Sequence, residues 1–181
     1  MNRLLLVVAG LTALAAGPMP RAHAEPPALH AGAIEAGLSG ALKIIEGSTT
    51  ASIALDGGYF LHAPGGLASL TVEAGYSHAS ELDLMDVSAL AGWTRAIGTT
   101  SLYPYVAVGG GVRQEWIGSF ADARYPVGFD VGLRALVSSG ADLRVNYRLR
   151  RVLNDPVEDF TEHELRVGIA LLFRNQGRIQ Q

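Results

Sequence analysis

The stretch 164–173, ELRVGIALLF, alternates residue by residue between two kinds of side chain. One set is large and apolar, whereas the other consists of charged residues, small residues and Leu172. Successive side chains of a β-strand point to opposite faces, so this period of two predicts a strand with one apolar face.

The same period recurs in seven earlier segments, which gives eight expected strands of about nine to twelve residues, the length of a tilted membrane strand. The seven segments are 34–43, 52–61, 69–76, 86–93, 105–113, 127–135 and 143–150. We expect short turns at 63–66, 96–101 and 138–141, brief links at 46–50 and 78–83, and longer loops at 114–124 and 153–163. This layout predicts an all-β fold, an eight-stranded antiparallel up-and-down transmembrane β-barrel.

The first 24 residues have the layout of a secretory signal peptide. Arg3 gives a positive start, residues 4–16 are apolar, and Ala22-His23-Ala24 offers a cleavage site between small residues. The apolar run is too short to span a bilayer as a helix, which needs about 20 residues, although a retained anchor is the alternative. We therefore predict a signal peptide (1–24), a periplasmic lead (25–32), a barrel (33–173) and a periplasmic tail (174–181).

The composition excludes several classes of protein. The 181 residues contain no cysteine, which excludes a disulfide scaffold, a cysteine metal site, a thiol nucleophile and a lipoprotein anchor. Hydrophobic residues make up 49% of the chain, so disorder is disfavoured. The net charge of −3 argues against nucleic acid as a partner.

Two kinds of barrel fit the alternation: a soluble one with an apolar lumen and a membrane one with an apolar exterior. A soluble barrel needs many solvated charges outside, but Lys43 is the only lysine. The polar set is rich in small residues, arginines and acids, which suit the narrow lumen of eight strands. We therefore predict that the apolar set faces lipid. A soluble, lipocalin-like binding barrel is the alternative.

The aromatic residues support the membrane arrangement. With the N-terminus in the periplasm, they form two girdles of the kind found at bilayer interfaces. Mid-strand Tyr147 does not fit this pattern. The expected girdles are Tyr59, Trp93, Tyr103 and Phe173 at the periplasmic ends, and Tyr76, Trp116 and Tyr125 at the outer ends.

Two motifs resemble a known family. Arg166-x-Gly168-x-x-Leu171-x-Phe173 resembles the C-terminal signal by which outer-membrane barrels are recognised for assembly, and 104–111 (PYVAVGGG) resembles the Gly-rich fifth strand of the small outer-membrane β-barrel family, the opacity-protein and OmpA-like transmembrane group. The similarity covers about 33–173. In many relatives the final aromatic ends the chain, whereas 174–181 follow Phe173 here. The resemblance implies a Gram-negative outer membrane, contact with its lipid and lipopolysaccharide, and insertion by the barrel-assembly machinery.

Charged side chains on the polar face are nearly balanced in sign. A gated or weakly anion-preferring pore is one interpretation. We expect a plug of ion pairs instead, since buried charge is costly unless paired and arginine binds carboxylates through two hydrogen bonds. Of these side chains, Arg144, Arg148 and Arg150 are best suited to bind an anion. The expected lumen network is Lys43, Arg113, Arg134, Arg144, Arg148, Arg150 and Arg166 with Glu35, Asp56, Glu73, Asp86, Asp130 and Glu164.

No metal or cofactor site is expected. His163-Glu164 begins like a His-Glu-x-x-His zinc motif, but Val167 stands at the second histidine position. Gly109-Gly110-Gly111 lacks the Lys-Ser/Thr of a phosphate loop, so close packing explains it better. An acidic run, expected to be a solvated loop or a weak divalent-cation bridge to lipopolysaccharide, comprises Asp155, Glu158, Asp159 and Glu162.

A hydrolase needs a nucleophile and a base that meet, and the best candidate is His78 beside Ser77 and Ser80. We regard this as loop chemistry and predict no enzyme. The expected function is a structural or interaction role at the cell surface, exerted through the loops of a barrel with a filled lumen. A narrow ion or small-solute channel, a lipid-modifying hydrolase and a soluble periplasmic binding barrel are the alternatives.

Overall fold

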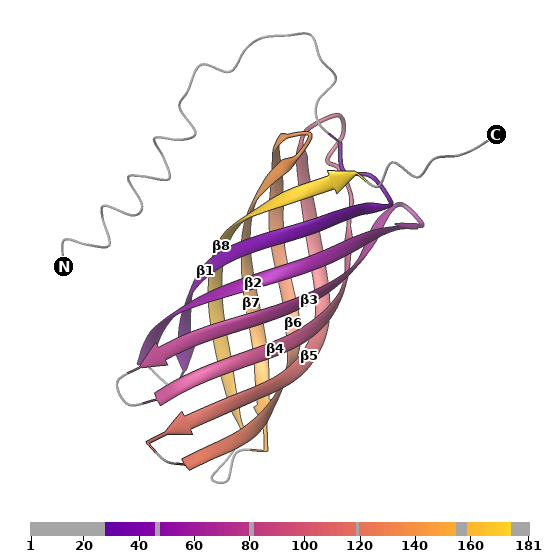
Figure 1. The fold of residues 1–181 in the computed structure, drawn as a ribbon. Helices are drawn as coiled ribbons and strands as arrows, with labels where there is room; N and C mark the ends of the chain where they lie inside the picture. The colour runs from indigo at the N-terminus through magenta and orange to yellow at the C-terminus, as the bar shows by residue number, and fades with distance from the viewer. Residues whose placement is uncertain (1–27, 46–47, 80–81, 119, 155–158, 175–181) are drawn as a thin grey trace, which may run out of the picture.

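The computed structural model describes residues 28–174 except 46–47, 80–81, 119 and 155–158. Eight antiparallel strands form one closed barrel, in which each strand pairs with the next and β8 pairs with β1 (Figure 1). This confirms the predicted fold class. No helix among the described residues is long and apolar enough to cross a membrane. The strands are β1 (Ala33–Ile45), β2 (Ser48–Ala63), β3 (Gly66–Ala79), β4 (Leu82–Thr94), β5 (Leu102–Ile117), β6 (Phe120–Ser138), β7 (Ala141–Leu153) and β8 (Phe160–Arg174).

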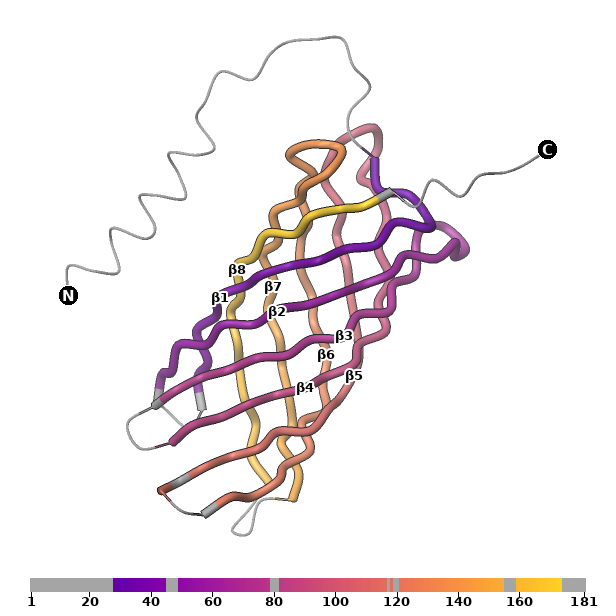
Figure 2. Tube along the Cα trace, viewed as in Figure 1, coloured from indigo at the N-terminus to yellow at the C-terminus, as the bar shows by residue number. Residues whose placement is uncertain are grey.

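The barrel has a terminal end, where β1 begins and β8 ends, and an opposite distal end (Figure 2). The predicted signal peptide lies outside the described residues, as do residues 175–181 of the predicted tail. The strands have 13 to 19 residues and are longer than predicted.

The predicted loop at 114–124 is wrong, because β5 continues to Ile117 and β6 already begins at Phe120. Glu115 faces Asp122 and Gln114 faces Ala123 across this hairpin. Polar side chains occupy both faces here, so the contrast that marks a strand in the sequence disappears.

The expected difference between short and long connections is also wrong. The longest gap between consecutive strands is 95–101, at the terminal end, where a short turn was predicted. Its turn is closed by Thr100, whose backbone N–H and hydroxyl both donate to the carbonyl of Ile97. At the distal end, the predicted loop at 153–163 is reduced to the link between Leu153 and Phe160.

Large apolar side chains face outward on all eight strands. One exposed example from each strand, in chain order, is Leu38, Leu55, Val72, Val87, Val108, Phe129, Val145 and Ile169. The predicted girdle residues Tyr59, Trp93, Phe173, Tyr76, Trp116 and Tyr125 are also exposed. The prediction that Tyr103 belongs to the periplasmic girdle is wrong, because its side chain points inward like that of Tyr105 and is 5% exposed.

Tyr103 instead belongs to an apolar plug in the terminal mouth, which we define as Leu29, Phe60, Tyr103 and Leu136. The Leu29 N–H donates to the Tyr103 hydroxyl at 3.0 Å. The Gly32 N–H donates to the carbonyl of Phe60 at 2.7 Å, and Gly32 itself has φ +82°, which favours glycine. The described part of the predicted periplasmic lead, 28–32, therefore folds onto the mouth of the barrel.

Glycines let the strands approach one another around the lumen. A Cβ atom at Gly109 would overlap the backbone carbonyl of Ala89, and one at Gly111 would overlap that of Val87. Backbone atoms of a paired strand cannot move aside as a flexible side chain can. This supports close packing as the reason for the 109–111 run.

Candidate functional site: the ion-paired lumen

The lumen is filled by charged side chains from all eight strands. Each of the thirteen predicted lumen residues forms at least one ion pair within 4.0 Å. The pairs form two clusters at different heights, which we call the terminal and the distal cluster.

The terminal cluster joins Arg134 and Arg144 to three carboxylates. Arg144 binds both oxygens of Asp56 at 3.0 Å. Arg134 binds Glu35 through a short ion pair, and its Nε lies 3.0 Å from Oδ2 of Asp142. The Arg134 guanidinium also lies 5.0 Å from the ring centroid of Phe60, so a cation–π contact connects this cluster to the plug.

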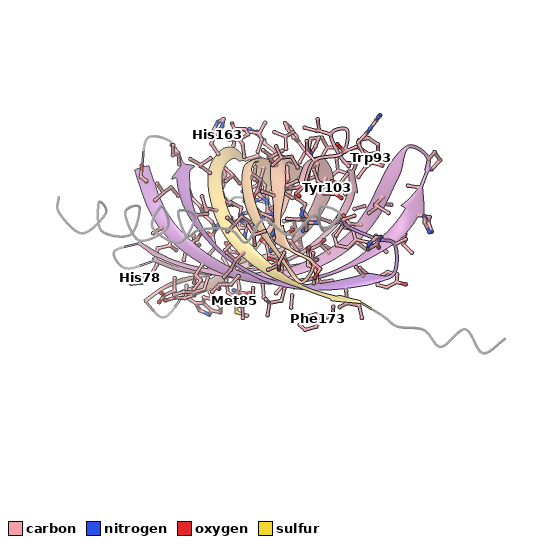
Figure 3. The ribbon with its side chains drawn as sticks, turned by 90° about the horizontal axis from the view of Figure 1, so that it is seen from above. His78, Met85, Trp93, Tyr103, His163 and Phe173 are labelled. Atoms are coloured by element: carbon pink, nitrogen blue, oxygen red, sulfur yellow. The ribbon has the colours of Figure 1, made fainter. Side chains whose placement is uncertain are left out.

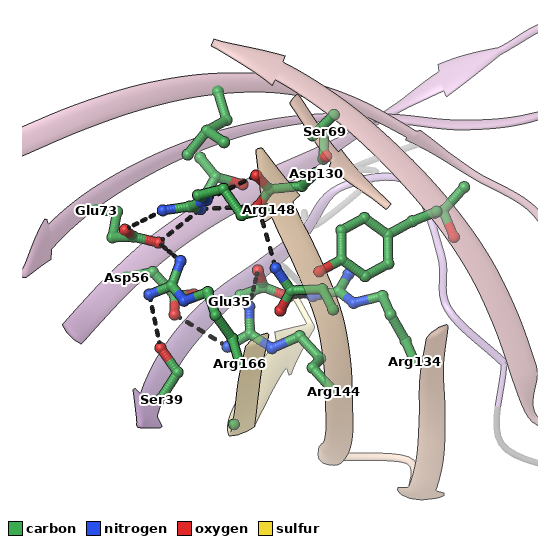
Figure 4. A pocket seen from close by; sticks show the side chains of 17 residues that line it. Glu35, Ser39, Asp56, Ser69, Glu73, Asp130, Arg134, Arg144, Arg148 and Arg166 are labelled. Atoms are coloured by element: carbon green, nitrogen blue, oxygen red, sulfur yellow. Dashed lines mark hydrogen bonds and ion pairs between the residues drawn. The ribbon is translucent and has the colours of Figure 1, made fainter. Parts of the chain in front are cut away.

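The distal cluster begins with Arg148, which bridges two strands. Its guanidinium binds Glu73 at 2.7 Å and Asp130 at 2.6 Å. Arg166 forms a short ion pair with the same Glu73 and lies 3.3 Å from Glu164. Charged hydrogen bonds therefore cross the lumen between β3, β6, β7 and β8 (Figure 4).

Further toward the distal end, Arg113 bridges Asp86 and Glu162 at 2.7 and 2.6 Å. Arg150 binds Glu162 at 2.7 Å, and Lys43 binds Asp86 at 2.9 Å. Arg113 and Glu162 are both fully buried. Buried charges of this kind are tolerated only when they are paired, as they are here.

Sequence reasoning missed two central members of these clusters, Asp142 and Glu162. The prediction that Glu162 belongs to a solvated acidic loop is wrong, because it is 0% exposed on β8. The alternation of faces along a strand could have identified both residues, because Glu162 shares the face of Glu164, and Asp142 shares the face of Arg144.

The missed residues reverse the charge balance of the lumen. With Asp142, Glu162, Glu115 and Arg124 added to the predicted set, the described lumen carries eight basic and nine acidic side chains. Each of the three arginines suggested as an anion site binds at least two carboxylates. The basis for a weak preference for anions therefore disappears.

A cavity of about 60 Å³ lies between the clusters. Its polar lining includes Glu35, Asp56, Tyr105, Asn146 and Arg166 (Figure 4). This volume suits a few water molecules with several polar partners each. It lies below the size of an ordinary small-molecule pocket, which is about 300 Å³ or more.

The histidines considered for catalysis lie outside the barrel wall (Figure 3). Ser77 faces inward and is 1% exposed, whereas the adjacent His78 faces outward and contacts Asp83 at 2.9 Å. The candidate Ser77–His78 pair is therefore split between opposite faces of the wall, and Ser80 lies outside the described residues.

His163 contacts the hydroxyl of Tyr147 on the outward face, while its neighbours Glu162 and Glu164 point inward. These neighbours therefore provide no ligands beside the imidazole. No group of three or more histidine, aspartate or glutamate residues that could hold a metal ion occurs in the described part of the chain.

Comparison with solved structures places this architecture among membrane barrels. Neisserial surface protein A superimposes with a TM-score of 0.60 at 14% identity, over 78% of this chain and 96% of that one. The N-terminal β-barrel domain of Pseudomonas aeruginosa OprF gives 0.59 at 16% identity, over 79% and 98%. The fold is that of a small outer-membrane barrel.

A third similar structure is Ail, the attachment invasion locus protein of Yersinia pestis. It gives a TM-score of 0.52 at 14% identity, over 80% of this chain and all of that one. These small barrels fit the opacity-protein and OmpA-like group that the sequence resembles. No protein-family model matches the chain, and no curated protein matches it by sequence.

Proposed function

We propose that this chain is an outer-membrane protein of a Gram-negative-type envelope, delivered by a cleaved signal peptide at 1–24. The observation that carries the proposal is the belt of exposed apolar side chains on all eight strands, around a lumen that holds the charges. A soluble barrel needs the reverse arrangement, since its exterior must be solvated. The belt therefore favours lipid over the lipocalin-like alternative.

Within the membrane, the barrel acts as a structural or interaction protein rather than a channel. The apolar plug fills the terminal mouth, and two ion-pair clusters occupy the lumen behind it. At the distal end, the inward-facing side chains of Leu84, Pro126 and Val152 are also buried. The long loops expected at the distal end are mostly strand. Contacts at the cell surface are therefore made by the distal ends of the strands rather than by loops.

Assembly in the envelope rests on the C-terminal motif of β8. Leu171 and Phe173 face outward, where another protein or lipid has access to them. Arg166 is buried in the distal cluster and Gly168 packs against β1, so neither is accessible in the closed barrel. We infer that the assembly machinery reads all four residues together only before β8 closes onto β1.

The experiment that tests the proposal compares boiled and unboiled gel migration of the mature chain after refolding in detergent micelles and in plain buffer. We expect β-structure and a heat-dependent shift in mobility only with detergent. Folding in buffer alone would refute the lipid-facing assignment. Planar-bilayer recordings test the channel alternative, and reproducible conductance steps would support it.

A further inference from the structure

One outward-facing patch breaks the apolar character of the barrel wall near the distal end of β7 and β8. This β7–β8 patch consists of Tyr147, Arg151, Thr161 and His163. Arg151 lies directly opposite Thr161, and His163 lies opposite Leu149. Of the arginine and lysine residues in strands between residues 33 and 173, Arg151 is the only one whose side chain faces outward.

Hydrogen-bond donors of the patch have no carboxylate partner among the residues that the structure describes. An Arg151 Nη1 lies 3.4 Å from the Thr161 hydroxyl, and the Tyr147 hydroxyl lies 2.5 Å from Nδ1 of His163. No carboxylate among the described residues pairs with Arg151, although the lumen arginines each bind at least one. Among the described residues Arg151 hydrogen-bonds only to Thr161, so most of the five N–H groups in its planar fork, a shape that fits a phosphate, have no partner there.

The position of the patch selects the kind of phosphate. On the side toward the terminal end, it borders the exposed apolar residues Leu165 and Val167. On the neighbouring β6, Arg151 lies opposite Val127, next to the exposed girdle residue Tyr125. A lipid-facing arginine is tolerated near the bilayer interface, which is where the phosphates of lipid headgroups lie.

A second outward-facing histidine provides an internal contrast. His78 lies at the same end of the barrel, but it contacts Asp83, which also accepts a hydrogen bond from Tyr76. A carboxylate at this position repels an anion. The two histidine sites of the outer wall therefore differ in the feature that matters for binding a phosphate.

We propose that the β7–β8 patch binds the phosphate headgroup of an outer-leaflet lipid, with Arg151 as the main anchor and the Tyr147, Thr161 and His163 side chains as further polar contacts. The proposal rests on the membrane location proposed above and names one lipid site within it.

The test is native mass spectrometry of the folded protein in detergent, with diphosphoryl lipid A as the probe and phosphatidylcholine as the zwitterionic comparison. We expect the wild type to retain lipid A preferentially. Arg151→Gln should lower its apparent affinity about tenfold, the size of one lost charge-assisted contact. Arg151→Lys should fall between the two, because it keeps the charge but loses the planar fork.

His78→Ala is the matched control at the other outward-facing histidine, and it should leave lipid A retention unchanged. Equal retention by the wild type and Arg151→Gln would overturn the proposal. Complete competition by millimolar inorganic phosphate would overturn it as well, by assigning the patch to a soluble anion. Each variant is first checked for its heat-dependent gel shift, so loss of the lipid site is distinguished from failure to form a detergent-folded barrel.

Discussion

Replacing Glu162 by glutamine tests whether ion pairs buried from solvent stabilise the barrel. This carboxylate is 0% exposed and binds Arg113 at 2.6 Å and Arg150 at 2.7 Å, with Lys43 at 3.9 Å. Glutamine keeps the shape but removes the charge, so three cations are left to share the remaining acids.

The expected loss of stability follows from these contacts. Removing one partner of a buried ion pair typically costs about 3–5 kcal/mol, because the other charge stays buried without compensation. With a urea dependence of about 2 kcal/mol per molar, the unfolding midpoint should fall by about 2 M. Reversible urea unfolding in lipid or detergent, followed by tryptophan fluorescence, measures this shift.

Asp122→Asn is the matched control, since Asp122 pairs with Arg124 through a side chain that is 54% exposed. An exposed pair contributes at most about 1 kcal/mol. Equal, small effects of Glu162→Gln and Asp122→Asn would refute the reasoning, because they would mean that water screens the lumen charges. A partial recovery in the double variant Glu162→Gln/Lys43→Met would show that charge balance, rather than shape, sets the cost.

Three further substitutions test the packing, each by the same urea assay. Gly109→Ala should destabilise the barrel by about 1–3 kcal/mol, because the added Cβ would meet the backbone of β4. The control Gly40→Ala, at an outward-facing glycine, should change stability by less than about 0.5 kcal/mol. Equal effects of the two substitutions would contradict close packing at Gly109. Leu29→Ala should cost about 2 kcal/mol if the plug packs as described, and no change would mean that 28–32 does not stabilise the mouth. Ser77→Ala should be neutral or stabilising by about 1 kcal/mol, since its buried hydroxyl has no hydrogen-bond partner among the described residues, and a marked loss would point to a bound water there.

Alternation of apolar and polar residues predicted the strands and most of the lumen residues, whereas features that leave no alternation in the sequence were missed. A period of two located all eight strands and assigned thirteen side chains to the lumen, because each strand separates an apolar outward face from a polar inward face. It failed at 114–124, where both faces are polar, and the acidic character of 155–162 hid Glu162 in an expected loop.

The plug at the terminal mouth is a different kind of failure. The segment 28–32 is too short to show a hydrophobic period. Its packing is set by contacts with three strands that are distant in the sequence, so the sequence alone does not reveal it. Tyr103 was misplaced because the girdle pattern was applied to it, although it shares the inward parity of Tyr105. Partner choice within the lumen was beyond prediction, because it depends on the stagger between strands.

The β5–β6 hairpin has a consequence for how this protein meets other molecules. Beyond Tyr125, β6 no longer pairs with β7, which leaves an open strand edge of the kind that recruits foreign strands or nucleates polymers. Side chains occupy this edge: the Asp122 carboxylate accepts from the Ala123 N–H, and Asn154 donates to the Ala123 carbonyl. An incoming strand would find these backbone groups already bonded, so the hairpin disfavours strand addition at Ala123.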